Sequence, residues 1–380
     1  MRDVVIVEAV RTPIGRRNGT LKDVHPVVLA AMSLRELMRR AGVEPALVED
    51  VVMGCVSQVG EQAINIARNA VLQAGFPIEV PATTVDRQCG SGQQAIHFAA
   101  NLIQAGVCDV TIAAGVESMS RLPIGSSTST GGNPFPPSLL EEYPLTHQGI
   151  SAEMIAAKWG IPRDELDAFS LRSHQRASAA ADGGYFDREL MTLPLADGSS
   201  FTRDEGIRRD TSVEKLASLP PSFKPDGVIT AGNSSQISDG AAALLLMTPE
   251  KASELGLRPR ARIVAQQVVG VDPVMMLTGP IPATKVVLAK GCLALDDIDL
   301  FEVNEAFAPV VLAWQREIQP DMERVNVNGG AIALGHPLGC SGARLMVTLL
   351  HELERREARY GLQTMCCGGG LGTATIIERL

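Results

Sequence analysis

The 380-residue sequence has few aromatic residues, no long apolar run and no excess of positive charge. Asp and Glu outnumber Lys and Arg, and the resulting formal net charge of -9 argues against a nucleic-acid-binding protein. The longest apolar run, Ala241 to Met247, is too short to span a bilayer. The opening "MRDVVIVEAV" lacks the basic start and long apolar core of a signal peptide. We therefore expect no membrane insertion.

The seven cysteines also exclude some classes of protein. They are scattered and odd in number, which does not suit a disulfide framework. Neither Cys-x-x-Cys pairs nor clustered histidines occur, so a zinc site is not expected and no metal is predicted. The glycine run from Gly368 to Gly372 does not have the spacing of a dinucleotide-binding fingerprint. A reduced, cytoplasmic setting fits this cysteine usage best.

What the sequence does have is 36 glycines and a regular alternation of apolar patterns. Short β-branched runs alternate with runs of helical spacing, which is typical of a mostly parallel sheet covered by helices. The sequence therefore predicts an α/β fold. The runs that carry this pattern are "VVIVEAV", residues 29–40, "VEDVVMGCV", residues 63–74, "ATTVD" and "DVTIAAGVESM".

The second half of the chain repeats the first. "RARIVAQQVVG" opens it as a strand, "LGCSGARLMVTLLHEL" repeats the small-residue turn that leads into a helix, and "LQTMCCGGGLGTATIIE" follows in the position of "DVTIAAGVESM". Between the copies lies a segment rich in Ser, Gly and Pro, then a helical stretch and further loops. We predict two duplicated α/β halves, 1–119 (completed by 237–260) and 261–380, separated by an inserted loop domain, 120–236.

Cys89 stands in "VDRQCGSGQQA", where a strand gives way to a helix. In the first turn of that helix, free N–H groups and the helix dipole would favour its thiolate. The same position also suits a small buried hydrophobe that fills the joint. From this segment alone, packing is the more common role.

Three further residues stand at equivalent places. His336 lies between Gly335 and Pro337 before a helix, where an accessible imidazole can act as a base, although many histidines are only surface or core residues. Cys366 and its neighbour Cys367 would point to opposite sides if they end a strand. Asn304, before another helix, suits either an N-cap or an amide that holds a water against an oxyanion.

Together these motifs resemble the thiolase family over essentially the full chain. The histidine and second-cysteine motifs are the most specific. The matching segments are "RTPIG" (11–15), "GVESMS" (115–120), "TAGNSSQISDGAA" (230–242), "NEAFA" (304–308), "NGGAIALGHPLGCSG" (328–342) and "CCGGGLG" (366–372). The resemblance implies the thiolase fold, in which the two halves pack in five layers (αβαβα).

The resemblance also implies roles. Cys89 would be the nucleophile that takes the acyl group as a thioester, and His336 would accept its proton. Cys366 would be the acid and base at the α-carbon of acetyl-CoA. The thioester oxygen would lie against His336 and a water held by Asn304, and the backbone N–H groups of Cys89 and Gly368 would form a second oxyanion hole.

Coenzyme A would be a co-substrate held largely by the insertion. The family resemblance places Arg208 near the nucleotide, Phe223 near the adenine, Ser235 and the segment of His147 near the pantetheine arm, and Met276 and Phe307 at the acyl pocket. Three residues depart from the family pattern, namely Asp86 (usually Asn), Gln93 (usually apolar) and Gln148 (usually Met). The Asp86 carboxylate would oppose a thiolate if it faced the sulfur, and we expect it to point into hydrogen bonds of the loop instead.

These features predict a 3-ketoacyl-CoA thiolase that forms acetyl-CoA and a shortened acyl-CoA through acylated Cys89, and its partners would be acyl-CoA and CoA. "VDRQCGSGQQA", "SSQISDGAA" and "RARIVAQ" resemble an actinobacterial degradative branch that includes steroid side-chain thiolases. The alternatives are an acetyl-CoA acetyltransferase that forms acetoacetyl-CoA, or a thiolase-like acyl-CoA or lipid-binding protein without turnover. A decarboxylating ketoacyl synthase is disfavoured, because enzymes of that class lack the second catalytic cysteine that this chain has at Cys366. The resemblance also implies a homodimer or a homotetramer.

Overall fold

The first half of the chain folds as an α/β unit. The computed structural model describes residues 2–129 and 131–380. Each strand and helix that the first-half patterns predict is present, with bounds that differ by a few residues. The elements are β1 (Val5–Arg11), β2 (Gly15–Arg16), α1 (Pro26–Ala41), β3 (Asp50–Gly54), α2 (Ile66–Ala74), β4 (Ala82–Val85), α3 (Ser91–Gln104) and β5 (Val110–Ser118). After the insertion, β8 (Ser238–Met247) lies between β5 and β1, and α8 (Pro249–Glu254) follows it.

The second half repeats this order, which confirms the predicted duplication. Its strands run β10, β11, β12, β9, as β3, β5, β8, β1 do in the first half. Where a counterpart of β4 would lie, Val325 forms a single parallel bridge with Phe301. The elements are β9 (Ala261–Gly270), α9 (Pro280–Gly291), β10 (Leu300–Val303), α10 (Ala308–Ile318), α11 (Ala331–Leu334), α12 (Leu338–Arg355), β11 (Tyr360–Cys367) and β12 (Leu371–Arg379).

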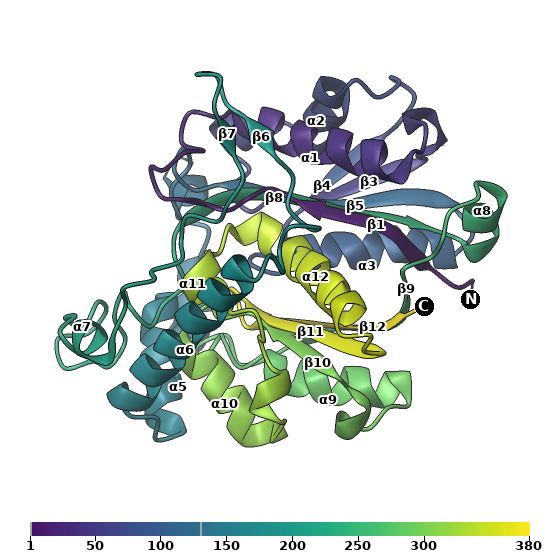
Figure 1. Cartoon of the computed structure of the whole chain (residues 1–380). Coiled ribbons are helices and arrows are strands. Elements are labelled where there is room, and N and C mark those ends of the chain that lie inside the picture. Colours follow the sequence, from purple (N-terminus) through teal and green to yellow (C-terminus); the bar gives the residue numbers. More distant parts are fainter. Residues whose placement is uncertain (1, 130) are drawn as a thin grey trace.

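The halves stack in five layers, as Figure 1 shows. Helices α1 and α2 cover the outer face of the first sheet, and α9 and α10 cover that of the second. Between the sheets, α3 and α12 pack against each other. The two sheets are joined at one edge, where β1 and β9 share only the pairs Val5–Arg262 and Ile6–Ala261. This is the αβαβα arrangement that the family resemblance implies.

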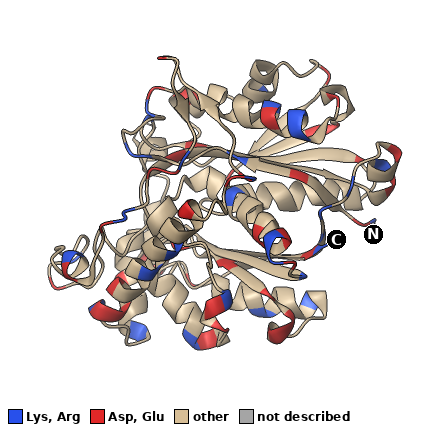
Figure 2. Cartoon of the chain, viewed as in Figure 1, with Lys and Arg blue, Asp and Glu red and all other residues tan. Residues whose placement is uncertain are grey.

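The central layer brings two helix N-termini together. Helix α3 carries no charged residue, as Figure 2 shows, and most of its side chains are buried in the core. A methyl group on Gly92 of α3 would lie 2.7 Å from the backbone N of Ala343, and one on Gly342 of α12 would lie 2.1 Å from that of Gln93. Only glycine fits at these two crossing points. The segments before the two helices, which hold Cys89 and His336, are thus held near one another.

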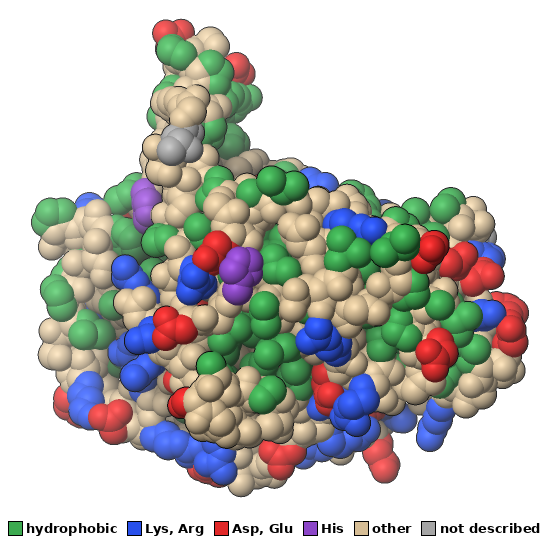
Figure 3. All heavy atoms as spheres, turned by 90° about the horizontal axis from the view of Figure 1, so that it is seen from above, with side chains coloured by type: hydrophobic (Ala, Val, Ile, Leu, Met, Phe, Trp, Pro, Cys, Tyr) green, Lys and Arg blue, Asp and Glu red, His purple; other side chains and the backbone are tan. Residues whose placement is uncertain are grey.

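The insertion between β5 and β8 contains mostly helices and loops. The predicted helical stretch consists of two helices, α5 and α6. From 131 to 144 every side chain except Leu139 is exposed, and this segment forms the narrow projection in Figure 3. The elements are α4 (Pro137–Glu142), α5 (Gln148–Lys158), α6 (Arg163–Asp182), β6 (Leu193–Pro194), β7 (Ser200–Phe201) and α7 (Val213–Ala217). In the described parts of the chain, no helix combines the length and apolar character needed to cross a membrane.

Candidate active site

Cys89 lies at the joint between β4 and α3. Gln88 before it has a φ of 50°, a left-handed conformation that turns the chain sharply, and Gly90 after it is the N-cap of α3. Cys89 therefore precedes the N-cap of α3 and lies outside the first helical turn, so the condition under which that turn would favour its thiolate is not met. Its side chain is only 3% exposed. The strained residue at 88 holds the thiol at the end of the helix rather than within it.

The sulfur of Cys89 meets two backbone N–H groups. Burial raises the pKa of Cys89 to about 11, while hydrogen bonds from the N–H groups of Gly368 and of Cys89 itself act in the opposite direction. The helix N-terminus alone was expected to favour the thiolate. The free-energy cost of burying the negative charge of a thiolate away from water is larger than the stabilisation that these N–H groups supply. Cys89 therefore rests as a thiol and needs a base at the moment of attack.

The second cysteine, Cys366, lies at the end of β11, just before the turn that leads into β12. Burial raises the pKa of Cys366 well above its usual value, and the nearby Cys89 raises it further. Cys366 packs in an apolar cluster with Met276 and Phe307. Cys367 faces elsewhere, since a methyl group on Gly90 would lie 2.5 Å from its sulfur. The two adjacent thiols thus point in different directions, and Cys366 shares the apolar cluster with the two predicted acyl-pocket residues.

His336 is buried and held at both ring nitrogens. Its Nδ1 lies 2.5 Å from Oγ of Ser341, and its Nε2 lies 3.3 Å from Nδ2 of Asn304. The Ser341 hydroxyl donates its one proton to the carbonyl of Pro337 at 2.9 Å, so it accepts from Nδ1–H of the imidazole. This assigns the unprotonated nitrogen to Nε2, which is the form that a proton acceptor needs.

Burial, assisted by Arg344, lowers the pKa of His336 to about 3. The imidazole is therefore neutral at neutral pH. Asn304 follows β10, whereas the N-cap of α10 is Phe307, so the N-cap alternative for Asn304 is wrong. Its Oδ1 is buried without a partner among the described residues, and this oxygen together with Nδ2 is suited to hold a water beside His336.

Glu117 is a buried carboxylate that the sequence reasoning missed. It accepts hydrogen bonds from the backbone N–H groups of Val56 (2.9 Å), Ser57 (3.0 Å) and Gly339 (2.8 Å). It thus ties the first turn of α12, three residues after His336, to the loop after β3. An acidic residue inside the fully buried strand "VTIAAGVES" was the available signal, because buried charges need partners.

Several predicted coenzyme A and acyl-pocket residues lie together. Phe223 stacks on His147 with ring centroids 5.2 Å apart, and it meets Phe307 edge-on at 5.9 Å. Met276 belongs to the same cluster as Phe307. The backbone N–H of Ser235 donates to Ala306, the residue before Phe307. These five residues surround one region beside Cys366.

Arg208 lies apart from that group. It is exposed, and it lines a small pocket with His174 and Gln236. Its backbone N–H donates to Nδ1 of His174 at 3.1 Å. Arg208 is therefore free to meet a ligand that approaches from solvent, but no direct contact joins it to the other predicted residues.

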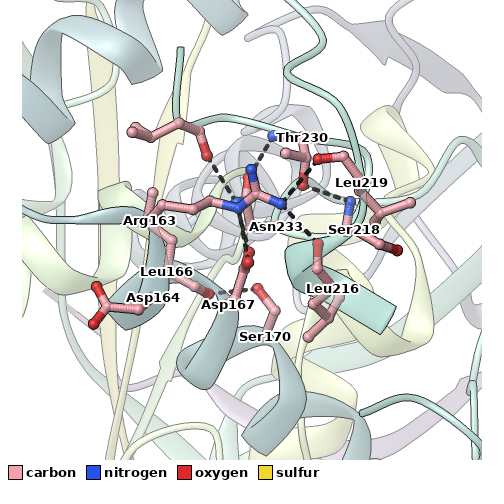
Figure 4. Close-up of polar contacts among 12 residues, drawn as sticks. Arg163, Asp164, Leu166, Asp167, Ser170, Leu216, Ser218, Leu219, Thr230 and Asn233 are labelled. Carbon is pink, nitrogen blue, oxygen red and sulfur yellow. Dashed lines mark hydrogen bonds and ion pairs between the residues drawn. The ribbon is translucent and has the colours of Figure 1, made fainter. Parts of the chain in front are cut away.

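A partly buried polar network anchors the insertion to this region (Figure 4). Arg163 donates to Asp167 at 2.7 Å and to the carbonyls of Leu216 and Leu219 at 2.7 and 3.0 Å. Asp167 also accepts from Nδ2 of Asn233 at 3.1 Å, and the carbonyl of Asn233 accepts from the first N–H of α10. The segment that holds Ser235 is thus fixed to both α6 and α10.

The three departures from the family pattern have clear environments. Asp86 accepts from the backbone N–H of Gln88 at 2.6 Å, as expected for a carboxylate turned into the loop, although its charge still raises the pKa of Cys89 slightly. Gln93 donates to Oγ1 of Thr375 at 2.7 Å and is satisfied within the core. Gln148 is half-buried at the start of α5.

No group of three or more His, Cys, Asp or Glu side chains is arranged to hold a metal ion within residues 2–129 and 131–380. The polar groups of the region are instead of two kinds: two backbone N–H groups and the Cys366 thiol act on Cys89, and the neutral imidazole of His336 lies beside the amide of Asn304. This set can accept and return protons and stabilise an oxyanion.

Fold and site together define an acyltransferase built on a duplicated α/β core. The chain belongs to the thiolase family, since the family model of the thiolase N-terminal domain matches residues 4–250 and that of the C-terminal domain matches residues 257–379.

Named relatives cover the whole chain. It is 51% identical to the steroid 3-ketoacyl-CoA thiolase FadA6 of Mycobacterium tuberculosis, over 100% of this chain and 95% of that protein. It is 46% identical to the 3-ketoacyl-CoA thiolase FadA of Escherichia coli K12, over the full length of both. The crystal structure of the Bacillus anthracis acetyl-CoA acetyltransferase superposes with a TM-score of 0.92 at 45% identity, covering 100% of this chain and 99% of that one.

Proposed function

We propose that the protein is a 3-ketoacyl-CoA thiolase, which uses CoA to cleave 3-ketoacyl-CoA into acetyl-CoA and a shortened acyl-CoA. The observation that carries this proposal is the buried imidazole of His336, whose Nδ1 is held by Ser341 and whose Nε2 lies 3.3 Å from the Asn304 amide, together with the two buried thiols Cys89 and Cys366. A base, an oxyanion donor and two thiols are the groups that this reaction needs. The relatives named as 3-ketoacyl-CoA thiolases support the same reaction.

In the first half-reaction, Cys89 would lose its proton to Nε2 of His336 as its sulfur attacks the 3-keto carbon. The N–H groups of Cys89 and Gly368, or His336 with a water on Asn304, would hold the developing oxyanion. The C2–C3 bond then breaks. The acyl group stays on Cys89, and the acetyl-CoA enolate takes a proton from Cys366. The high pKa values of both buried thiols support proton transfer during each step rather than a preformed thiolate.

In the second half-reaction, the Cys366 thiolate would take the proton of the incoming CoA thiol. The CoA sulfur attacks the thioester, and Cys89 leaves and recovers its proton from His336. Both catalytic thiols are then restored, so protons balance over the cycle.

We further propose that the insertion, 120–236, binds CoA. Arg208, exposed beside a small pocket, suits a phosphate group, and the faces of Phe223 and His147 suit the adenine and the pantetheine arm. Ser235, Met276 and Phe307 would line the way to Cys89. The anchoring of this region by the Arg163 network supports a preformed binding surface.

The test is direct. Acetoacetyl-CoA and longer 3-ketoacyl-CoAs are mixed with CoA and folded enzyme, and the loss of the enolate absorbance is followed. We expect CoA-dependent cleavage of at least one chain length. Absence of turnover with every chain length would contradict the proposal and favour the acyl-CoA-binding alternative.

A second candidate is the acetoacetyl-CoA-forming acetyl-CoA acetyltransferase, which the similarity to the Bacillus anthracis structure favours. It would use the same residues. The ratio of kcat/KM for acetoacetyl-CoA to that for longer substrates separates the two, because an acetyltransferase is restricted to the shortest one.

We also propose a cytoplasmic homodimer or homotetramer. All seven cysteines are free, which suits a reducing compartment. The exposed apolar side chains Phe135, Leu140 and Tyr143 on the projection are of the kind that a subunit contact covers. Sedimentation equilibrium of the purified protein gives the subunit number, and a monomer would contradict this part of the proposal.

A further inference from the structure

Two side-chain amides lie beside the backbone donor that meets Cys89. A methyl group placed on Gly368 would lie 3.2 Å from Oε1 of Gln88 and 3.5 Å from Nε2 of Gln148. The Gly368 N–H is one of the groups that lower the pKa of the Cys89 thiol, so Gly368 and the two amides beside it lie near the sulfur that would carry the acyl group. These amides therefore form part of the wall that the first carbons of the acyl chain meet.

Gln88 is fixed with its carbonyl oxygen available. Its backbone N–H donates to Asp86, and its Nε2 faces the same carboxylate at 3.3 and 3.4 Å. The side-chain donor is thereby occupied. Oε1 is left as an acceptor toward Gly368.

Gln148 supplies the complementary group. It is the first residue of α5, and His147 before it accepts the N–H of Gly149 at 3.1 Å while stacking on Phe223. The start of the helix is thus held in place. Among the described residues, no hydrogen bond engages the Gln148 amide, so its Nε2 is a free donor toward the same space.

The other wall differs in character. Around Cys366 the side chains are apolar, including Met276, Phe307 and Ile332. An acyl chain on Cys89 would therefore have an apolar surface on one side and an acceptor and a donor on the other. A purely hydrocarbon chain leaves both amides without partners once it excludes water, which costs binding free energy.

The local charge selects among polar groups. The Asp86 carboxylate lies at Gln88, so a carboxylate on the acyl chain would be repelled. A hydroxyl group is neutral, donates one hydrogen bond and accepts another. It matches Oε1 of Gln88 and Nε2 of Gln148 together.

We propose that Gln88 and Gln148 are specificity-determining residues that favour 3-ketoacyl-CoA substrates with a neutral hydroxyl group on the first few carbons beyond the 3-keto carbon. This inference rests on the proposed thiolase function and names its substrate class.

The experiment compares three substrates of equal chain length. One is a straight-chain 3-ketoacyl-CoA, the second carries a hydroxyl on carbon 6, and the third carries a carboxylate at the chain end. The wild-type protein and the Gln148→Met and Gln88→Met variants are assayed. Gln104→Met, at the far end of α3, is the matched control.

For the wild type, we expect kcat/KM for the hydroxylated substrate to exceed that for the straight chain about tenfold, because only the hydroxyl can pair with both amides. The carboxylate substrate should be the poorest. Gln148→Met and Gln88→Met should each reduce the ratio to about threefold or less, and Gln104→Met should leave it unchanged.

Three outcomes would overturn the inference. In the first, Gln148→Met leaves the ratio of kcat/KM for the hydroxylated substrate to that for the straight chain unchanged. The same variant lowers kcat/KM equally for every substrate and raises KM for CoA. That result would assign the amides to the pantetheine arm. Another is a preference for the carboxylate or the straight chain. Turnover of none of the three substrates would instead overturn the proposed function, and this inference with it.

Discussion

Ser341 bridges His336 and the start of its own helix: its Oγ lies 2.5 Å from Nδ1 of the imidazole and donates to the carbonyl of Pro337, the N-cap of α12. The hydroxyl therefore fixes both the orientation and the tautomer of the ring, and leaves Nε2 as the nitrogen that can accept a proton. Ser341 is a positioning residue, since it acts on the reacting atoms only through His336.

Ser341→Ala should lower kcat about tenfold to a hundredfold with little change in KM, because a buried Nδ1–H loses its acceptor at a cost of about 1–3 kcal/mol. Steady-state kinetics with a 3-ketoacyl-CoA and CoA measure this. Ser33→Ala is the control, since Ser33 makes a similar bond to Ala30 in α1 and lies 0% exposed without a histidine partner. Equal kcat values for the two variants would contradict the assigned role.

Cys89→Ser and Cys366→Ser should separate the two thiols. Incubation with a simple acyl-CoA should leave Cys89→Ser unmodified, because the acceptor of the acyl group is gone. Cys366→Ser should still show some acyl adduct at Cys89 but no complete cleavage cycle. Intact-protein and peptide mass spectrometry give the result, with the exposed Cys292→Ser variant as control. If the Cys366 variant never carries an adduct at Cys89, the division of roles is wrong.

The pattern of apolar residues predicted the repeated α/β halves because local periodicity determines the elements and burial of their apolar faces determines the layers. Ile96, Ala99, Ala100 and Ile103 are all fully buried, as their helical spacing indicates. The family motif predicted that Asn304 lies beside His336, whereas the spacing of residues in the sequence did not.

The sequence could not give the state of the thiol. A helix N-terminus lowers a thiol pKa, and only the packed structure shows that burial of Cys89 outweighs it. Nor could it show which side chain holds Nδ1 of His336, because Ser341 reaches the ring only after Gly335 and Pro337 have set the turn before α12. Both features depend on three-dimensional proximity rather than on local pattern.

Gly92→Ala should destabilise the central layer. The added methyl would lie 2.7 Å from the backbone N of Ala343 and 2.8 Å from the carbonyl oxygen of Gly339, and backbone atoms cannot yield locally. Overpacking of this kind typically costs about 1–3 kcal/mol. Urea unfolding should show a lower midpoint, together with loss of activity because Cys89 and His336 precede the two helices. Gly270→Ala is the control: no atom lies within 4 Å of its added methyl group, so the unfolding midpoint and the activity should stay unchanged. A Gly92→Ala variant as stable as the wild type would refute the tight crossing.

Glu302 should make stability fall as pH rises. Burial raises its pKa to about 8, with Arg344 acting in the opposite direction, while the ordinary value is 4.5. Between these values the folded protein holds a proton that the unfolded chain has released, so the free energy of unfolding decreases with pH. Glu302→Gln removes this term. Its stability advantage over wild type should therefore grow from about pH 4.5 to 8, by at most about 1.4 kcal/mol per pH unit, and level off above. Urea titrations at several pH values measure it, with the exposed Glu79→Gln as control; a pH-independent difference would show that the carboxyl is ionised throughout.

Asp86 affects Cys89 in two ways that two variants can separate. Its charge raises the pKa of the thiol, and its oxygen holds the backbone of Gln88, which has a φ of 50°. Asp86→Asn removes the charge and keeps an acceptor, so the pKa of Cys89 should fall and alkylation by iodoacetamide should begin at lower pH, with the turn intact. Asp86→Ala also removes the acceptor. Gln88 can then relax toward negative φ, which displaces the thiol from the Gly368 N–H, so kcat should fall about tenfold or more, since loss of one oxyanion donor typically costs 10²–10³. If both variants change alkylation and kcat alike, the carboxylate acts through its charge alone and the turn does not depend on it.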